Sequence, residues 1–93
     1  MIQRFVTMES DMTYFYELRA FNYKGECFDV REYSNEKIAK SKFNLFVSNT
    51  KAGHKQCLEN NIKPTFLAYE MQLVKRDDNY IGLAELENWK AAA

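Results

Sequence analysis

Residues 13–33 have the sequence TYFYELRAFNYKGECFDVREY, in which two apolar-rich runs are joined by a short polar turn. Aromatic and β-branched residues, which favour strands, crowd the first run, residues 13–23. Lys24 and Gly25 suit the turn because glycine adopts a positive φ without steric cost. Residues 26–33 then return as a second strand. This segment predicts a β-hairpin.

Side chains alternate between the two faces of a strand, so each hairpin residue can be assigned to a face. On the first strand, the more uniformly apolar face is expected to lie against the core; it consists of Tyr14, Tyr16, Leu18 and Ala20. On the second strand, Phe28 and Val30 are expected to point inward. The opposite face, here called the outer hairpin face, mixes aromatic and charged side chains: Phe15, Glu17, Arg19, Phe21, Tyr23, Cys27, Asp29, Arg31 and Tyr33.

The segment after the hairpin predicts the main helix. A side-chain oxygen of Ser34 or Asn35 can accept from a free N–H of the first turn, and Glu36 favours the positive end of the helix dipole. Apolar residues follow at helical spacing: Ile38, Ala39, Phe43, Phe46 and Val47. Polar residues occupy the other face: Lys37, Lys40, Asn44, Ser48 and Lys51. We expect the helix to end near Ala52, with Gly53 as a left-handed cap.

The second half of the chain is less regular. Residues 54–59 are compatible with a short second helix, which Asn60 and Asn61 would end. Residues 65–76 fit a strand better than a helix, because Glu70 would interrupt the apolar stripe of a helix. Asp77 to Asn79 then predict a hairpin loop, and residues 80–83 a short partner strand. Residues 85–89 are interpreted as a helical turn or a tail.

The predicted order is strand, strand, helix, strand, strand. Such an order indicates an α+β fold, a small antiparallel sheet with one main amphipathic helix packed on one face. With 93 residues the chain is long enough for a single domain, residues 1–93. We interpret residues 1–10 as an irregular N-terminal segment and residues 91–93 as a cloning remnant.

Composition narrows the classes of function. The chain has 13 basic and 13 acidic residues, so its net charge of zero argues against a dominant electrostatic partner. A single His and three isolated Gly leave no motif for nucleotide or cofactor binding, and we expect neither a cofactor, nor a metal, nor an enzyme. The spacing His54-x-x-Cys57 is interpreted as a surface His beside a buried Cys rather than as a catalytic or zinc pair.

The sequence also carries information about the compartment. No signal peptide and no run of about 20 apolar residues is visible, so we expect no membrane partner. Cys27 and Cys57 are interpreted as free thiols of a protein in the reducing cytoplasm.

The leading functional hypothesis is a non-enzymatic protein-binding module. Aromatic residues and Arg are enriched at the cores of interfaces, and the outer hairpin face is rich in both. The candidate protein-binding residues are Phe15, Arg19, Phe21, Tyr23, Arg31 and Tyr33. The partner would be another protein or a second copy of this chain. The small size and the lack of catalytic residue types are typical, as a class, of phage- or mobile-element-encoded inhibitors of host proteins.

The alternative hypothesis is a small nucleic-acid-binding protein. Residues 34–63 hold six Lys against two Glu, which gives this third of the chain a net charge of +4. A row of Lys on the outer face of the helix would contact phosphates. The candidate nucleic-acid-binding residues are Lys37, Lys40, Lys51 and Lys55.

Overall fold

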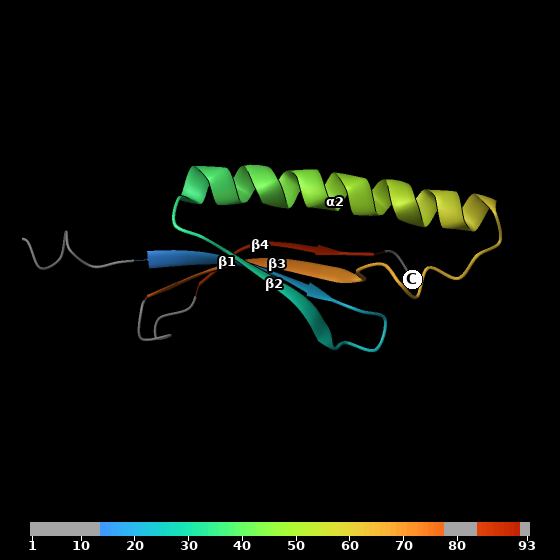
Figure 1. Cartoon of the computed structure of the whole chain (residues 1–93), viewed down its shortest axis with the longest axis horizontal. Helices are drawn as coiled ribbons and strands as arrows, with labels where there is room; N and C mark the ends of the chain where they lie inside the picture. The colour runs from blue at the N-terminus through green and yellow to red at the C-terminus, as the bar shows by residue number, and fades with distance from the viewer. Residues whose placement is uncertain (1–13, 78–83, 92–93) are drawn as a thin grey trace, which may run out of the picture.

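The structure is a computed structural model, and it describes residues 14–77 and 84–91. The elements follow in the order β1 (Tyr14–Phe21), β2 (Cys27–Tyr33), α2 (Glu36–Glu59), β3 (Glu70–Asp77) and β4 (Ala84–Lys90) (Figure 1). The strands form one antiparallel sheet in the order β2-β1-β3-β4, and α2 covers one of its faces. The predicted α+β fold is confirmed.

The first hairpin is present as predicted. Asn22 Oδ1 accepts hydrogen bonds from the N–H groups of Lys24 and Glu26, both at 2.9 Å, and Gly25 has a φ of 82°. The pairing of the two strands is irregular at one place, because Ala20 pairs with Asp29 while Phe21 pairs with Cys27. Phe28 is therefore an extra, unpaired residue, which defines a β-bulge.

The bulge reverses the faces of the rest of β2. Since one extra residue shifts the alternation by one position, every following side chain changes face. Asp29, Arg31 and Tyr33 pair with the inward residues of β1 and lie on the helix side, whereas Val30 lies on the outer side. The predicted faces of these four residues are wrong, although that of Phe28 holds: it lines the same hollow as Leu18 and Ala20.

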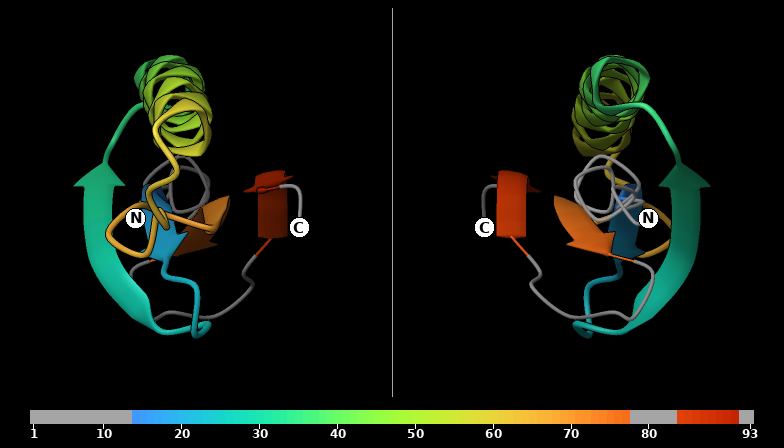
Figure 2. Two further views of the ribbon diagram at one scale, coloured as in Figure 1. Left: turned by 90° about the vertical axis from the view of Figure 1, so that its right-hand side faces the viewer. Right: turned by 90° about the vertical axis from the view of Figure 1, so that its left-hand side faces the viewer.

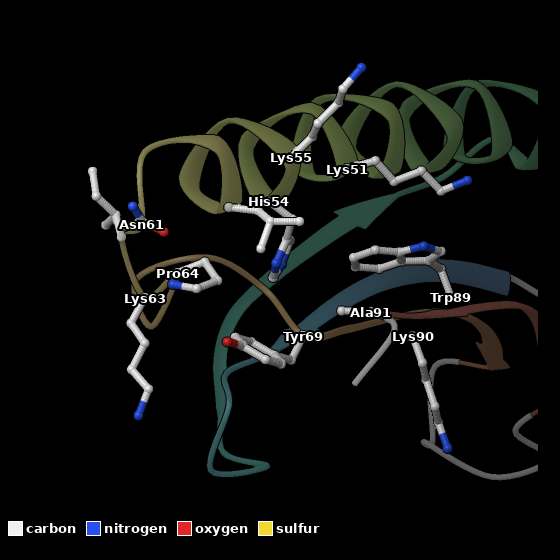
Figure 3. A pocket seen from close by; sticks show the side chains of 12 residues that line it. Lys51, His54, Lys55, Asn61, Lys63, Pro64, Tyr69, Trp89, Lys90 and Ala91 are labelled. Atoms are coloured by element: carbon white, nitrogen blue, oxygen red, sulfur yellow. The ribbon is translucent and has the colours of Figure 1, made fainter.

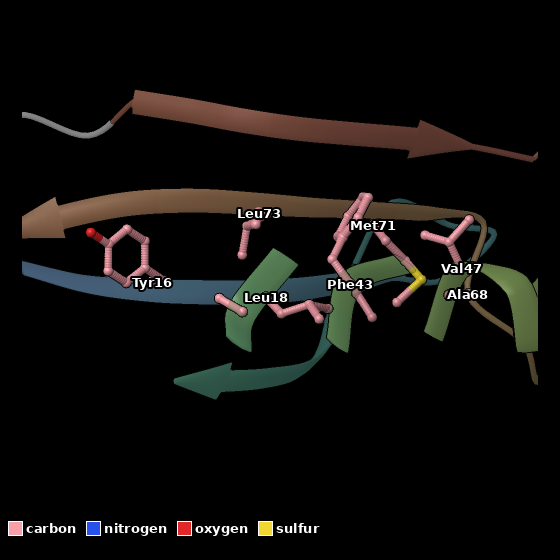
Figure 4. Close-up of a cluster of buried hydrophobic side chains, with 9 residues drawn as sticks. Tyr16, Leu18, Phe43, Val47, Ala68, Met71 and Leu73 are labelled. Carbon is pink, nitrogen blue, oxygen red and sulfur yellow. The ribbon is translucent and has the colours of Figure 1, made fainter. Parts of the chain in front are cut away.

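The core lies between α2 and the centre of the sheet (Figure 4). It contains most of the residues predicted to point inward from β1 and α2, joined by three residues between positions 68 and 73: Tyr16, Leu18, Ala20, Ala39, Phe43, Val47, Ala68, Met71 and Leu73. Tyr14, also predicted to point inward, is 39% exposed. Tyr33, Phe46, Leu86 and Trp89 pack against its edges. The apolar face of the predicted helix is confirmed for Ala39, Phe43 and Val47, whereas Ile38 is 51% exposed.

The start of α2 is confirmed and its predicted end is wrong. Asn35 is the N-cap, and its Oδ1 accepts from the N–H of Ile38 at 3.0 Å. The helix continues through Gly53 to Glu59, so residues 54–59 extend it rather than form a second helix. A Cβ at Gly53 would lie 3.1 Å from Leu67 Cδ1, so the glycine here permits close packing of the helix. The left-handed residue is Asn61, with a φ of 57°.

Two expectations concern β3 and β4. The strand assignment of residues 65–76 is confirmed, although β3 begins only at Glu70. Residues 85–89 belong to β4, so their assignment to a helical turn or tail is wrong. The pairing of β3 with β4 has a register shift between Leu73 and Val74. As a result, Leu86 and Trp89 both pack against the core although they are three residues apart, which is the spacing expected of a helix.

Several expectations lie outside the described residues. These are the irregular segment at residues 1–10, the partner strand at residues 80–83 and most of the hairpin loop, of which only Asp77 is described, as the last residue of β3. Ala91, the first residue of the presumed cloning remnant, donates its N–H to Tyr69 O at 2.8 Å and so prolongs the pairing of β3 with β4.

Candidate functional site

The six candidate protein-binding residues do not form one face. Phe15, Arg19 and Phe21 lie on the outer side of β1, as predicted. Arg31 and Tyr33 lie on the helix side because of the bulge. Tyr23 lies in the turn itself, with its ring centroid 6.2 Å from that of Tyr69. Sequence reasoning missed the bulge, since a single unpaired Phe leaves no sign in the hydrophobic pattern.

The outer side of β1 holds a network of charges instead of an exposed aromatic face. Glu17 accepts from Arg19 Nη2 at 2.8 Å and from Arg76 Nε at 2.5 Å, and Arg76 also pairs with Glu32. The guanidinium of Arg76 lies 4.7 Å from the ring centroid of Phe15. Arg76 is 4% and Glu17 7% exposed, so each buried charge has its partner within hydrogen-bond reach. The side chains of Phe15 and Arg19 thus make their contacts within the domain.

This network makes stability depend on pH. Burial acts to raise the pKa of Glu17, but hydrogen bonds from Arg76 and Arg19 and their charges outweigh it and hold the pKa below its usual 4.5. The contribution of Glu17 is therefore complete above pH 4.5 and is lost as the pH falls through the lower folded-state pKa. We expect the urea concentration at the midpoint of unfolding to decrease as the pH is lowered below 4.5. Glu17→Gln is expected to make this decrease smaller. Glu59→Gln, at the exposed end of α2, is the control; an unchanged slope in Glu17→Gln would contradict the assignment.

The four candidate lysines all lie on α2, and they divide into two groups. Lys37 and Lys55 are about 27 Å apart along the helix axis. Lys40 pairs with Glu36 at 3.0 Å on the exposed surface, as in most solvated helices. Lys51 and Lys55 line a groove, whereas Lys37 does not. The structure therefore places only half of the predicted lysine row at a concave site.

The groove lies between the C-terminal half of α2, the segment that follows it, the start of β3 and the end of β4 (Figure 3). It has a volume of about 810 Å³. Its lining combines four lysines with apolar and aromatic side chains: Lys51, His54, Lys55, Leu58, Asn61, Ile62, Lys63, Pro64, Tyr69, Trp89, Lys90 and Ala91. We call it the lysine groove. Sequence reasoning missed Lys63 and Lys90, because only folding brings β4 beside the end of α2.

His54 fixes the inner wall of the lysine groove. Its side chain points from α2 toward the space between Tyr69 and Trp89 (Figure 3), with ring centroids at 5.0 Å and 6.0 Å. Nε2 lies 2.8 Å from the carbonyl oxygen of Ala68, which can only accept, so Nε2 carries the proton and donates. The imidazole is thereby held by the backbone, half-buried in the wall of the groove, and the predicted burial of Cys57 is confirmed.

A second concave site lies on the other flank of α2, toward β2. This hollow of about 240 Å³ is lined by Phe28, Phe46 and Phe66 together with residues of the sheet and helix: Leu18, Ala20, Asp29, Arg31, Asn49, Thr50, Leu67, Ala68 and Met71. We call it the phenylalanine hollow. Phe28 is 53% and Phe66 67% exposed. Arg31 lies 4.8 Å above the ring of Phe46 and pairs with Asp29 at 3.2 Å, so the charges at the rim cancel.

In the part of the chain that the structure describes, the remaining reactive side chains form no cluster. Cys27 is exposed and Cys57 buried, and both are free. Within residues 14–77 and 84–91, no group of three or more His, Cys, Asp or Glu side chains is placed to hold a metal ion. In the same part of the chain, no helix has the length and apolar character needed to cross a membrane.

Comparisons of the chain with protein-family models, with curated proteins and with solved structures gave no match. The functional argument therefore depends on the geometry of the two concave sites and of the charge network.

Proposed function

We propose that this domain is a non-enzymatic protein-binding module and that the phenylalanine hollow is its main contact surface. The observation that carries this proposal is the exposure of Phe28 and Phe66 at 53% and 67% beside a hollow. Exposed apolar side chains gathered around a concavity are a common feature of protein interfaces. Neither ring belongs to the core cluster.

The chemistry of the hollow favours an apolar side chain of the partner. Because Arg31 and Asp29 pair with each other at 3.2 Å, the rim offers little net charge to a charged ligand. Phe46 is half-buried beneath Arg31, which leaves Phe28 and Phe66 as the rings that a partner would cover. Each large apolar side chain that is fully covered contributes about 1.5–3 kcal/mol.

The finer parts of this proposal concern context. The two free thiols support a reducing compartment, and we propose a cytoplasmic site of action. The particular role that we propose is that of a small phage- or mobile-element-encoded inhibitor that acts on a host protein. The competing role, nucleic-acid binding through a lysine row on α2, has less support, because only two of its four candidate lysines, Lys51 and Lys55, lie at a concave site.

The chain contains a matched pair of residues for the test. Phe28 and Val30 lie on the same strand, both are 53% exposed, and only Phe28 lines the hollow. We expect Phe28→Asp to abolish capture of a protein partner from host extract, while Val30→Asp captures it like the wild type, with or without nuclease. Equal capture by both variants would exclude the hollow, and capture that nuclease removes would favour the nucleic-acid alternative.

A further inference from the structure

The lining of the lysine groove carries several positive charges and no negative one among the described residues. Its four lysines, Lys51, Lys55, Lys63 and Lys90, are all exposed. Among the described residues, no carboxylate lies within ion-pair distance of any of them, and no acidic side chain lines the groove. The lysines come from three segments that surround the groove (Figure 3). The side chain of Lys90 points away from α2, on the sheet face where Lys90 pairs with Glu70. Lys51, Lys55 and Lys63 therefore supply most of the positive field that attracts a ligand with negative charges.

The groove also exposes apolar groups that folding leaves in water. Leu58 is 77% exposed and Ile62 52% exposed, on either side of the end of α2. Pro64 continues this wall. A ligand that fits both features has a hydrophobic part between negative charges. Acidic protein segments with an apolar side chain and single-stranded nucleic acids both have this combination.

The aromatic residues decide between these two ligands. A nucleic-acid base needs a free ring face on which to stack. In this groove His54 lies between the two rings, at an interplanar angle of 82° to Tyr69 and 61° to Trp89. The imidazole is fixed there by its hydrogen bond to Ala68 O. The most exposed apolar side chains of the wall are the aliphatic Leu58 and Ile62, whereas Tyr69 and Trp89 are half-buried, which suits a leucine-like side chain better than a base.

We propose that the lysine groove binds a short acidic segment of a protein, with an aliphatic side chain against Leu58 and Ile62 and the flanking carboxylates on the lysines. This site shares no residue with the phenylalanine hollow. The two proposals can therefore fail separately, and Phe28→Asp is expected to leave binding at the groove unchanged.

Trp89 provides the readout, because it lines the groove and is the only Trp in the chain. The probe is an acetylated hexapeptide with two leucines flanked on each side by Asp and Glu, added to the full chain while Trp89 emission is recorded. We expect a saturable change whose affinity falls as NaCl is added. A peptide with Lys in place of the acidic residues is expected to give no change.

The variants test the two features of the groove separately. We expect Lys51→Glu combined with Lys63→Glu to weaken peptide binding about tenfold or more. Lys37→Glu combined with Lys42→Glu, on exposed helix positions outside the groove, is the matched control and should bind like the wild type. Leu58→Ala is expected to weaken binding without changing its dependence on salt. All variants are checked by circular dichroism for the wild-type fold.

Three results would overturn this proposal. They are the absence of any peptide binding by fluorescence and calorimetry, equal peptide affinity of both double-lysine variants, and tighter binding of a twelve-residue oligothymidylate than of the peptide. The last result would assign the groove to single-stranded nucleic acid.

Discussion

Phe43→Ala is expected to destabilise the domain by about 3–5 kcal/mol, the largest effect of any single substitution proposed for this chain. Phe43 lies on the buried face of α2, is 4% exposed and belongs to the core cluster (Figure 4). Its removal loses the transfer free energy of the ring and leaves a cavity between the helix and the sheet. A loss of this size is a large fraction of the total stability of a small domain.

Urea denaturation monitored by circular dichroism measures this loss. Phe66→Ala is the control, because Phe66 is 67% exposed, and it is expected to cost less than about 1 kcal/mol. A cost for Phe43→Ala as small as that of Phe66→Ala would mean that α2 does not pack on the sheet as described.

Arg76→Ala is expected to destabilise the domain by about 3 kcal/mol, the second largest effect. The guanidinium is buried, bonds to Glu17 Oε2 at 2.5 Å and pairs with Glu32. Removal of one partner of a buried ion pair leaves the other charge insufficiently compensated, which costs about 3–5 kcal/mol. We expect the lower end of this range because Arg19 still bonds to Glu17 at 2.8 Å.

The control for Arg76 is Arg31→Ala, also an arginine on a strand of the sheet. The pair of Arg31 with Asp29 is about half exposed, so its loss is expected to cost at most about 1 kcal/mol. Arg76→Met separates charge from packing, since Met retains contact with Phe15. If Arg76→Met were as stable as the wild type, the packing on Phe15 and not the charge would account for the effect of Arg76→Ala.

Rules that consider only residues close together in the sequence predicted the parts of the fold that depend on short-range interactions. The turn at Gly25, the cap at Asn35 and the inward face of β1 depend on residues only a few positions apart, and all three are confirmed. The same rules predicted a helix end at Gly53, because a glycine after a helical pattern usually marks a cap. The helix instead continues through Gly53, where Leu67, distant in sequence, packs so closely that a Cβ on the glycine would lie 3.1 Å from Leu67 Cδ1.

The errors in the sheet have a common cause in its two register shifts. The unpaired Phe28 reversed the faces of Arg31 and Tyr33, and the shift between Leu73 and Val74 gave Leu86 and Trp89 a helix-like spacing. A register shift depends on how two strands meet, and neither strand records it in its own alternation. Because of the bulge at Phe28, Arg31 and Tyr33 do not lie on the outer face with the other predicted binding residues.

By itself the sequence determined the α+β class, the order of the elements, the start of the helix and most of the core, because short-range periodicity and capping specify them. Only the tertiary structure decided which distant residues meet: Phe28 and Phe66 at the phenylalanine hollow, Glu17 and Arg76 in an ion pair, and Lys51 and Trp89 at the lysine groove. These pairs are between 38 and 59 positions apart in the chain. Their proximity depends on strand order and register, which result from packing the whole domain at once.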